Sequence, residues 1–516
     1  MSNESSEKVE LSTVTITDLQ DKDEALKLVG LERTEEVNEE RYQQVKRKLD
    51  LVIPPLCAAV YGTQYLETTL RELEATLSSY GSPVASIMGL PITGQHYNLA
   101  ALAYSLGYLF WVFPTMYISQ KLRLGKYLGV NIVLWGIIMM LHAVPSSFGP
   151  FFVLRFLLGM LESCVAPTLI LIISMFYKKD EQATRMSWFY MMIGVAEIFG
   201  GFVAYGVSFD FHSGIAPYKI MYLLCGALAA TVGSCVLLWM PDSPLHARFL
   251  SHEERVGAVE RIREDQGGTE NKKLKREQVA EALLDIRTWL IVMSTVITSV
   301  PVGSLTNFGN IVIKSFGYTS RQALILSSPT GAVCIITTLF CGWYSDRKNE
   351  RMLPIIWSLL PTIIGAAMLV GLKGSAHKGA LLFAVYIAQS FGSSISIIYS
   401  YNASNTSGHT KKVTINAMTL AAFCVGNIIG TETFLPKDAP DYIPGKTAIL
   451  VLLSSQVFIC LLLRWMNRRL NGKKRQFIED MKARNHWTEV DVERERQRHA
   501  FLDMTDKQNP YFVYIA

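Results

Sequence analysis

Charge is scarce in this chain. Charged residues make up 18% of its 516 positions, against about 25% in soluble domains. The net charge is only +5, and the basic residues lie in short stretches beside long apolar runs, which gives no sign of a nucleic-acid partner. A soluble core stops growing at roughly 250–300 residues, whereas the apolar runs here continue along most of the chain, so a bilayer is its natural solvent.

Paired cysteines are also lacking. None of the eight cysteines forms a Cys-x-x-Cys pair, so we expect neither a disulfide framework nor a metal site, and we interpret the cysteines as packing residues. No nucleophile–base pair is evident, so we expect no enzyme and no cofactor. The polar start of the chain has no charged region leading into a short apolar run with a cleavage site. We therefore expect the first apolar helix to be retained.

Long apolar runs fill most of the remaining chain. A helix needs about 20 apolar residues to cross a bilayer, and about twelve runs approach or meet this length. These runs are 50–68, 97–119, 127–145, 150–176, 184–208, 219–240, 288–313, 322–344, 353–371, 379–400, 413–432 and 447–466. The sequence therefore predicts an all-α membrane protein.

A charged stretch divides six runs from six, which is the layout of paired repeats. The expected parts are a disordered tail (1–49), a first six-helix bundle (50–240), a central loop (241–287), a second six-helix bundle (288–469) and a charged tail (470–516). Lys and Arg gather in alternate connections, whereas the turn at 145–150 has none. Positive charge marks the cytoplasmic side, so we expect both termini there, in a multi-pass protein of the plasma membrane.

Few ionisable side chains fall within the apolar runs: Glu67, Arg155, Glu162, Glu197 and Glu432. A charge there costs at least about 2.5–3.5 kcal/mol on insertion scales, so each is a functional candidate. Arg155 and Glu162 are separated by about two helical turns and face the same side. A guanidinium beside a protonatable carboxylate can couple a proton to an anion. A static ion pair that holds helices together is the alternative.

The other glutamates differ in context. Glu197 lies in mid-run between glycines, where loss of water lets a carboxylate take up a proton near neutral pH. Glu67 ends the first run, after Gln64 and Tyr65, and either takes part in function or only marks the membrane boundary. Glu432 lies near the outer end of its run and is a weaker candidate.

Uncharged polar residues complete the candidates for substrate binding. With Arg155 they are Gln64, Tyr65, His96, Asn307, Gln389, Tyr399 and Asn427. Pro301, upstream of Asn307, predicts a broken helix, whose freed backbone groups are tolerated in a membrane only beside a cavity or other protein. Gln389 and Tyr399 make the run 379–400 polar on one face. His96 begins its run, and an interfacial position explains it equally well.

The stretch Gly342-Trp-Tyr-Ser-Asp346-Arg347-Lys-Asn-Glu-Arg351 resembles the loop between spans 8 and 9 of the major facilitator superfamily. The stretch 155–162 matches the span 4 pattern of that superfamily. The loop 120–129 lacks the aspartate that the superfamily usually has there, and this departure is similar to the fungal anion:cation symporter family typified by the allantoate permease. The stretches 61–66, 402–412 and 437–445 are also similar to motifs of that family.

The resemblance implies two six-helix bundles around a central cavity and proton-coupled uptake of a small organic anion by alternating access. Substrates in the family include allantoate, ureidosuccinate, nicotinate, pantothenate, biotin and small peptides. In this scheme Glu67, Glu162 or Glu197 binds the proton and Arg155 attracts the anion or exchanges partners. Asp346, Arg347 and Arg351 latch the cytoplasmic ends. We expect a monomer whose partners are the anion, the proton and the lipid bilayer.

One departure from the family lies after the first run. Glu67-Thr68 stands where the family has Asp-Lys, and residues 71–86 are extra. A genuine extracellular insertion and a gene-model error both fit, which leaves the role of Glu67 and the activity of this isoform open. Two other functions also remain open: a proton-driven exporter of a metabolite or toxin, and a non-transporting nutrient sensor.

Overall fold

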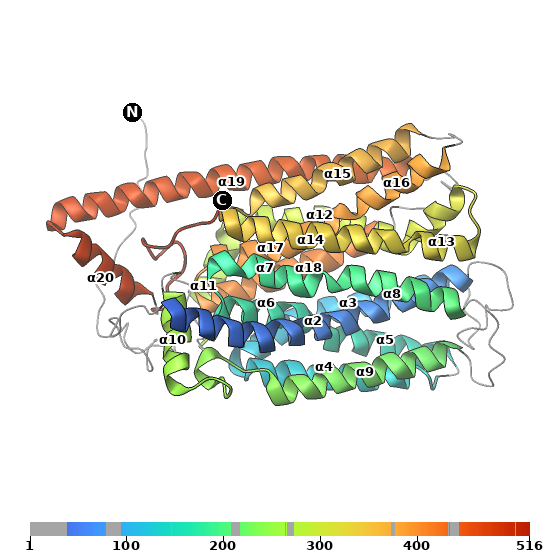
Figure 1. The fold of residues 1–516 in the computed structure, drawn as a ribbon, viewed down its shortest axis with the longest axis horizontal. Coiled ribbons are helices and arrows are strands. Elements are labelled where there is room, and N and C mark those ends of the chain that lie inside the picture. Colours follow the sequence, from blue (N-terminus) through green and yellow to red (C-terminus); the bar gives the residue numbers. More distant parts are fainter. Residues whose placement is uncertain are drawn as a thin grey trace.

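The computed structural model describes residues 39–78, 94–145, 147–207, 217–263, 265, 273–372, 377–431, 433, 443–500 and 502–516. Within these residues every regular element is a helix, and the long helices lie side by side along one axis (Figure 1). Several predicted features lie wholly or partly outside them, namely the tail 1–49, the extra residues 71–86, Glu432 and the stretch 437–445.

The described part of the first half crosses the bundle six times. Its helices are α2 (Glu39–Ser78), α3 (Gly94–Lys121), α4 (Leu124–Leu141), α5 (Phe148–Glu162) with α6 (Val165–Phe176), α7 (Lys179–Tyr190) with α8 (Met192–Val207), and α9 (Pro217–Trp239). Three short helices follow at the end of the bundle: η3 (Pro244–His246), α10 (His252–Arg263) and α11 (Arg276–Leu284). This arrangement agrees with the predicted runs to within a few residues at most ends.

The second half repeats the pattern of six crossings in its described residues. Its helices are α12 (Ile286–Ser315), α13 (Ser320–Leu326) with α14 (Ser328–Lys348), α15 (Met352–Gly371), α16 (Lys378–Ala388) with η4 (Gln389–Phe391) and α17 (Gly392–Asn405), α18 (His409–Thr431), and α19 (Ile443–Asn485). Helix α20 (Glu489–His499) turns back from the long end of α19. The segment 502–516 then returns to the bundle.

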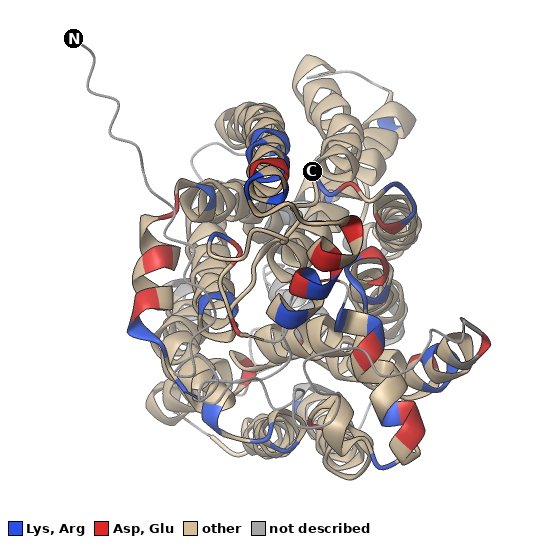
Figure 2. Cartoon of the chain, turned by 90° about the vertical axis from the view of Figure 1, so that its left-hand side faces the viewer, with Lys and Arg blue, Asp and Glu red and all other residues tan. Residues whose placement is uncertain are grey.

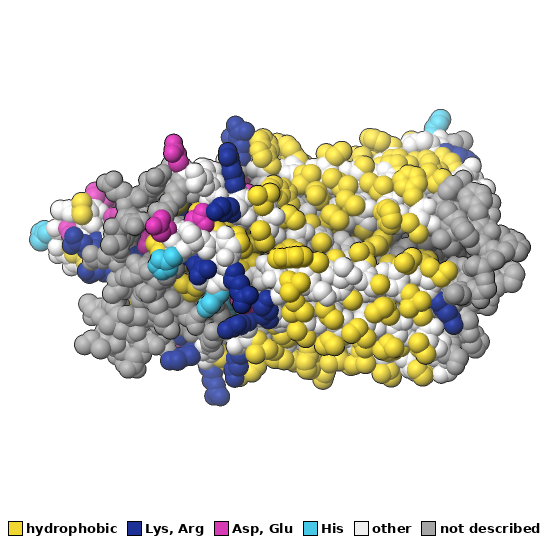
Figure 3. Space-filling view, turned by 60° about the horizontal axis from the view of Figure 1, so that its bottom comes forward, with side chains coloured by type: hydrophobic (Ala, Val, Ile, Leu, Met, Phe, Trp, Pro, Cys, Tyr) yellow, Lys and Arg dark blue, Asp and Glu magenta, His cyan; other side chains and the backbone are white. Residues whose placement is uncertain are grey.

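The surface of the bundle is that of a membrane protein. Nine crossings in the described residues are long and apolar enough to span a bilayer, and α2, α3 and α14 lie beside them in the same bundle. Figure 3 shows the apolar band and the Lys and Arg side chains that border it at one end. Figure 2 looks onto this charged end.

Glycines bring helix backbones into contact where the site lies. A Cβ atom added at Gly159 on α5 would lie 2.1 Å from the carbonyl oxygen of Tyr104 on α3. One added at Gly194 on α8 would lie 2.3 Å from the carbonyl oxygen of Gly331 on α14. Small residues allow such close crossings in membranes. The second crossing joins the first half of the chain to the second.

The predicted break in the run 288–313 is wrong, because α12 continues through Pro301. A proline removes one backbone hydrogen bond, here the one to the carbonyl oxygen of Ile297, and α18 packs closely against α12 just after the proline. The hydroxyl of Ser304 lies 2.9 Å from the carbonyl oxygen of Val300 and 2.9 Å from that of Gly430. Other crossings are interrupted instead, between α5 and α6, α7 and α8, α13 and α14, and at η4.

Candidate functional site

Helices α5 and α2 place a buried ion pair inside the first half. Nη1 of Arg155 lies 3.1 Å from Oε1 of Glu67, and the two side chains are 2% and 5% exposed. Nη2 of Arg155 donates a hydrogen bond to the hydroxyl of Tyr222 on α9. The guanidinium also lies 5.2 Å from the ring centre of Phe151. Removing one partner of a buried ion pair destabilises the fold by about 3–5 kcal/mol. Arg155 and Glu67 therefore each depend on the other for a counter-charge.

Two polar side chains near this pair were not among the predicted residues. Tyr222 is one, and His142, just after α4, is the other. The ring centre of His142 lies 5.3 Å from that of Tyr222, in a stacked geometry, and 5.3 Å from that of Phe151. His142 is 2% exposed. Its signal in the sequence was a histidine inside an apolar run, which a search for Asp, Glu, Lys and Arg passes over.

Glu162 is the last residue of α5 and is 1% exposed. The sequence places Glu162 beside Arg155, but the carboxylate that pairs with the guanidinium is that of Glu67. The fourth crossing is interrupted just after Glu162, because Pro167 has no N–H to donate to the carbonyl oxygen of Ser163 one turn earlier.

A second polar cluster lies between the two halves. Nε2 of Gln389 donates to Oε1 of Glu197 at 3.0 Å. The hydroxyl of Thr330 on α14 lies 3.4 Å from Oε2. The close crossing of Gly194 and Gly331 brings α8 against α14 here, and the 3₁₀ turn η4 presents Gln389. A carboxylate of the first half is thus held by polar groups of the second.

Aromatic rings connect the halves between these groups and the charged end of the bundle. The ring centre of Tyr61 lies 4.9 Å from that of Tyr65 and 4.8 Å from that of Tyr190, and Tyr190 lies 5.9 Å from Tyr399 on α17. Tyr399 is 1% exposed. Gln64 is buried one residue before Tyr65. Four tyrosine rings thus form a continuous series of contacts that begins on α2, continues on α7 and ends on α17.

The remaining predicted binding residues are less informative. Nδ2 of Asn427 donates to the carbonyl oxygen of Phe423, one turn earlier in α18, at 2.9 Å. His96 lies in α3 and Asn307 in α12, but both side chains are outside the described residues. The described residues also hold no group of three or more His, Cys, Asp or Glu that could bind a metal ion.

A set of polar contacts, called the latch below, joins the halves at the charged end of the bundle. Oδ1 of Asp346 accepts a hydrogen bond from the backbone N–H of Ala183 at 3.1 Å, and Oδ2 accepts one from that of Thr184 at 2.7 Å. Nη1 of Arg351 lies 3.1 Å from Oδ1 of Asp346. The guanidinium of Arg351 also donates to the carbonyl oxygen of Lys179, the first residue of α7. Residues where α14 ends and α15 begins, at the charged end of the bundle, thus contact the first half of α7.

Arg347 lies apart from this latch. Its guanidinium lies 5.2 Å from the ring centre of Trp343 on the same helix, and its side chain is exposed. Arg351, in contrast, is fully buried. Of the three predicted gating residues, the structure therefore brings Asp346 and Arg351 together.

Buried ionisable groups within and between two six-helix halves of an apolar bundle define a secondary transporter of the membrane. The model of the Major Facilitator Superfamily matches residues 59–431, and the chain belongs to this superfamily. It is therefore an integral multi-pass membrane transporter and not an enzyme.

Known proteins support this assignment. The chain is 32% identical over 508 residues to the allantoate permease of Saccharomyces cerevisiae. This alignment covers 95% of this chain and 90% of the permease. It is 31% identical over 475 residues to a thiamine pathway transporter of the same yeast, covering 92% and 86%. Its fold is similar to that of the proton:xylose symporter XylE, with a TM-score of 0.63, 14% identity and coverage of 83% and 96%.

Proposed function

We propose that this chain is a proton-coupled symporter that takes up a small organic anion across the plasma membrane by alternating access of its two halves. In this proposal it works as a monomer with both termini in the cytoplasm. The observation that carries the proposal is the buried pair of Arg155 and Glu67, since it presents a cation to an anion and a carboxylate to a proton at one place.

The geometry suggests how the two ligands are coupled. While Glu67 is ionised, it satisfies the charge of Arg155. When Glu67 takes up a proton, the guanidinium is left in a low-dielectric site without its counter-charge, a state that is strongly unfavourable. An organic anion then fills the vacated position, so proton and anion bind together. Loss of the proton to the cytoplasm returns Glu67 to Arg155 and displaces the anion.

Glu197 supplies a second proton-sensitive contact. As a carboxylate it accepts the hydrogen bond from Gln389 across the two halves. A hydrogen bond to an ionised acceptor is stronger than one to a neutral acceptor, so protonation weakens this contact. We propose that the proton state of Glu197 biases the packing of α8 against η4 and α14, and with it the opening of the halves.

The yeast allantoate permease supports an organic anion as the substrate. It is named for allantoate, a carboxylate, and it is 32% identical to this chain. Other carboxylates, such as ureidosuccinate, nicotinate and pantothenate, belong to the same chemical class. Arg155 recognises the carboxylate that they share and does not choose among them.

Uptake of labelled anions tests the proposal. Cells without their own permeases would express the chain, and the initial uptake of each anion would be measured at pH 5 and pH 7. We expect faster uptake at pH 5, and loss of uptake in Arg155→Ala but not in the matched control Arg494→Ala, an exposed arginine of α20. Uptake that is indifferent to pH, or unchanged kinetics in Arg155→Ala, would contradict the proposal.

A second assay separates coupling from binding and import from export. In Glu67→Gln the side chain is permanently neutral, so we expect counterflow of anion in vesicles to persist while accumulation driven by a pH gradient is lost. The direction of the imposed gradient that drives accumulation in the unchanged protein distinguishes uptake from proton-driven export.

A further inference from the structure

The segment 502–516 lies against the cytoplasmic end of the bundle. Its side chains are buried at several points, with Phe512 1%, Asp506 1% and Tyr514 3% exposed. The sequence predicts only a charged cytoplasmic tail here. A segment that buries aromatic rings and a carboxylate against the transporter is instead a docked element with a site of its own.

The run 402–412, a motif to which the proposed function assigns no role, forms much of that site. The side chain of Asn405 exchanges two hydrogen bonds with the backbone of Ile515, at 3.0 and 2.6 Å. The hydroxyl of Ser407 donates to the carbonyl oxygen of Met504 at 2.8 Å. The backbone N–H of His409 donates to Oδ1 of Asp503 at 2.8 Å. The end of α17 and its connection to α18 thus form hydrogen bonds with both the backbone and a side chain of the segment 502–516.

Helix α19 supplies the opposite wall. Nζ of Lys474 lies 2.5 Å, 2.8 Å and 3.2 Å from the carbonyl oxygens of Asp506, Asn509 and Phe512. The side chain of Asn471 exchanges two hydrogen bonds with the backbone of Tyr514, at 2.7 and 2.9 Å. Backbone groups that would otherwise be left without partners when buried are therefore satisfied.

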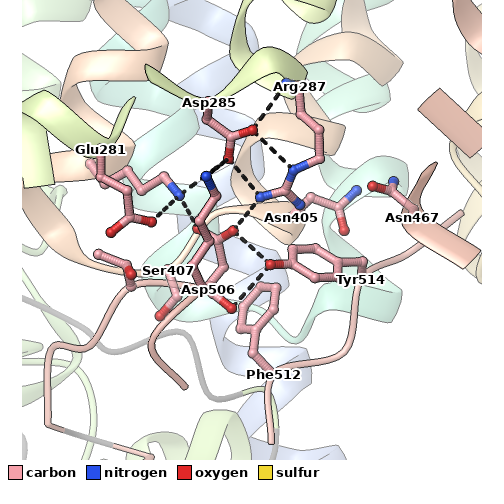
Figure 4. A network of polar contacts seen from close by, with 12 residues as sticks. Glu281, Asp285, Arg287, Asn405, Ser407, Asn467, Asp506, Phe512 and Tyr514 are labelled. Carbon is pink, nitrogen blue, oxygen red and sulfur yellow. Dashed lines mark hydrogen bonds and ion pairs between the residues drawn. The ribbon is translucent and has the colours of Figure 1, made fainter. Parts of the chain in front are cut away.

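A charged network fixes the centre of the segment (Figure 4). The carboxylate of Asp506 lies 2.6 Å from Nη2 of Arg287 and 2.6 Å from Nζ of Lys411, and accepts a hydrogen bond from the hydroxyl of Tyr514 at 2.9 Å. Burial by itself would raise the pKa of Asp506, but Arg287 and Lys411 outweigh it and hold that pKa well below its ordinary value of 3.8. Asp506 therefore stays ionised at neutral and mildly acidic pH.

The segment reaches from the second half to the first at one place. Nζ of Lys179, the first residue of α7, lies 3.5 Å from the ring centre of Phe512 and 3.3 Å from the carbonyl oxygen of Val513. The backbone of Arg351 donates to the carbonyl oxygen of Ala516 at 2.6 Å. The side chain of Arg351 pairs with Asp346 and bonds the carbonyl oxygen of Lys179. The segment is thus attached to the residue that holds the latch.

We propose that residues 502–516 form a strap that docks on the 402–412 run and α19, bridges to Lys179, and stabilises the state that is closed toward the cytoplasm. Its anchors lie on the second half, so the strap travels with that half. Opening toward the cytoplasm breaks the contact of Phe512 and Val513 with Lys179 together with the latch. Undocking the strap weakens the latch, because Arg351 loses the backbone contact that helps to position it.

The test measures the opening directly and needs no substrate. Nitroxide labels at Asp180→Cys and Lys348→Cys report the separation of α7 and α14 at the cytoplasmic end, since both native side chains are exposed. Cys235→Ser completes the background, because the other seven cysteines are buried. Distances would be recorded by pulsed electron paramagnetic resonance on the full chain in lipid nanodiscs.

Lys179→Met removes the bridge and leaves the anchors of the strap in place, whereas Phe512→Ala removes the bridge together with the ring contacts of Phe512 with Lys474 and Tyr514. We expect each to raise the ratio of open to closed molecules by about fivefold or more. Val513→Ala is the matched control, because its side chain is 61% exposed and its carbonyl group remains, so we expect no change. Deletion of 502–516 should raise the open population further.

Two outcomes would overturn the proposal. One is a distance distribution that is unchanged in both Phe512→Ala and Lys179→Met. The other is a deletion that lowers thermal stability without any shift toward the open state, as a purely structural tail would. The proposal rests on the alternating access proposed above. Unchanged distances with intact pH-driven uptake would refute the strap alone, whereas pH-indifferent uptake with shifted distances would refute proton coupling alone.

Discussion

Two clusters of buried charge in this chain differ in how fully their charges are matched. Within the membrane part, the guanidinium of Arg155 pairs with Glu67 and bonds one hydroxyl, that of Tyr222. At the charged end of the bundle, Asp506 is held by Arg287, Lys411 and the hydroxyl of Tyr514. Lys411 in turn pairs with Glu281, and Arg287 with Asp285.

The difference separates an exchangeable site from a fixed one. A single buried pair gains little net energy, because desolvation of its charges nearly cancels their attraction. A proton or a substrate anion can therefore replace one partner. A network in which every member has several partners loses many contacts when one leaves, so it holds its geometry. We expect the first cluster to carry transport and the second to position the strap.

The largest expected effect is on stability, at the fixed network. Asp506→Ala leaves Arg287 and Lys411 buried without a shared counter-charge, and removal of one partner of a buried pair costs about 3–5 kcal/mol. The midpoint of thermal unfolding, followed by tryptophan fluorescence in detergent, should fall accordingly. Glu493→Ala on the exposed face of α20 serves as the control. An unchanged midpoint in Asp506→Ala would remove the contrast between the clusters.

The next effect is on transport, at the exchangeable pair. Arg155→Lys keeps the charge, but an ammonium group cannot reproduce the two directed contacts of a guanidinium with Glu67 and Tyr222. We expect anion uptake to fall by about tenfold to a hundredfold, which corresponds to about 1.4–2.8 kcal/mol, while the thermal midpoint changes little. A large loss of stability with normal uptake would instead make Arg155 a structural residue.

A glycine substitution tests the contact between the halves without touching any charge. In Gly194→Val the new Cβ would meet the carbonyl oxygen of Gly331 at 2.3 Å, and overpacking of this kind costs about 1–3 kcal/mol. Separation of α8 from α14 should also pull Glu197 away from Gln389 and reduce the pH dependence of uptake. Gly472→Ala is the control, because no atom lies within 4 Å of its added Cβ.

Acidity should distinguish the clusters in a further way. The pKa of Asp506 is lowered in the folded protein, so its stabilisation is present above the ordinary value of 3.8 and is lost only as the pH falls through the lower folded value. The difference in thermal midpoint between the unchanged protein and Asp506→Asn should be the same at pH 7 and pH 5. A difference that shrinks at pH 5 would mean that the strap, and not the membrane pair, responds to uptake conditions.

The smallest effect is expected at the surface. Arg468 is 58% exposed and lies 3.0 Å from Glu350, which Arg464 also contacts at 2.8 Å. Exposed pairs contribute about 0–1 kcal/mol, so Arg468→Ala should leave both the thermal midpoint and uptake close to those of the unchanged protein. A clear fall in the thermal midpoint or in uptake would show that an exposed ion pair at this end contributes as much to stability or transport as a buried one.

Much of the fold was predictable, because the length of an apolar run decides whether a helix can cross a bilayer. The run 353–371 corresponds to α15, Met352–Gly371, and 219–240 to α9, Pro217–Trp239. The path of α12 through Pro301 was not predictable, since a proline inside an apolar run fits a broken helix and a continuous one equally well, and the neighbouring helix α18 is distant in sequence. The candidate residues could be identified because an ionisable side chain is energetically unfavourable inside an apolar run. The residues that they contact could not be identified in this way.

By itself the sequence determined that this chain is a bundle of membrane helices, and which few polar side chains had to be buried in it, because apolar length and isolated charge are local properties. Only the tertiary structure decided that Arg155 pairs with Glu67, 88 positions away, and that Gln389 reaches Glu197, 192 positions away. It also decided that residues 502–516 return to the 402–412 run. Such contacts depend on which helix faces pack together, and packing across a bundle has no counterpart in the spacing of residues along the chain.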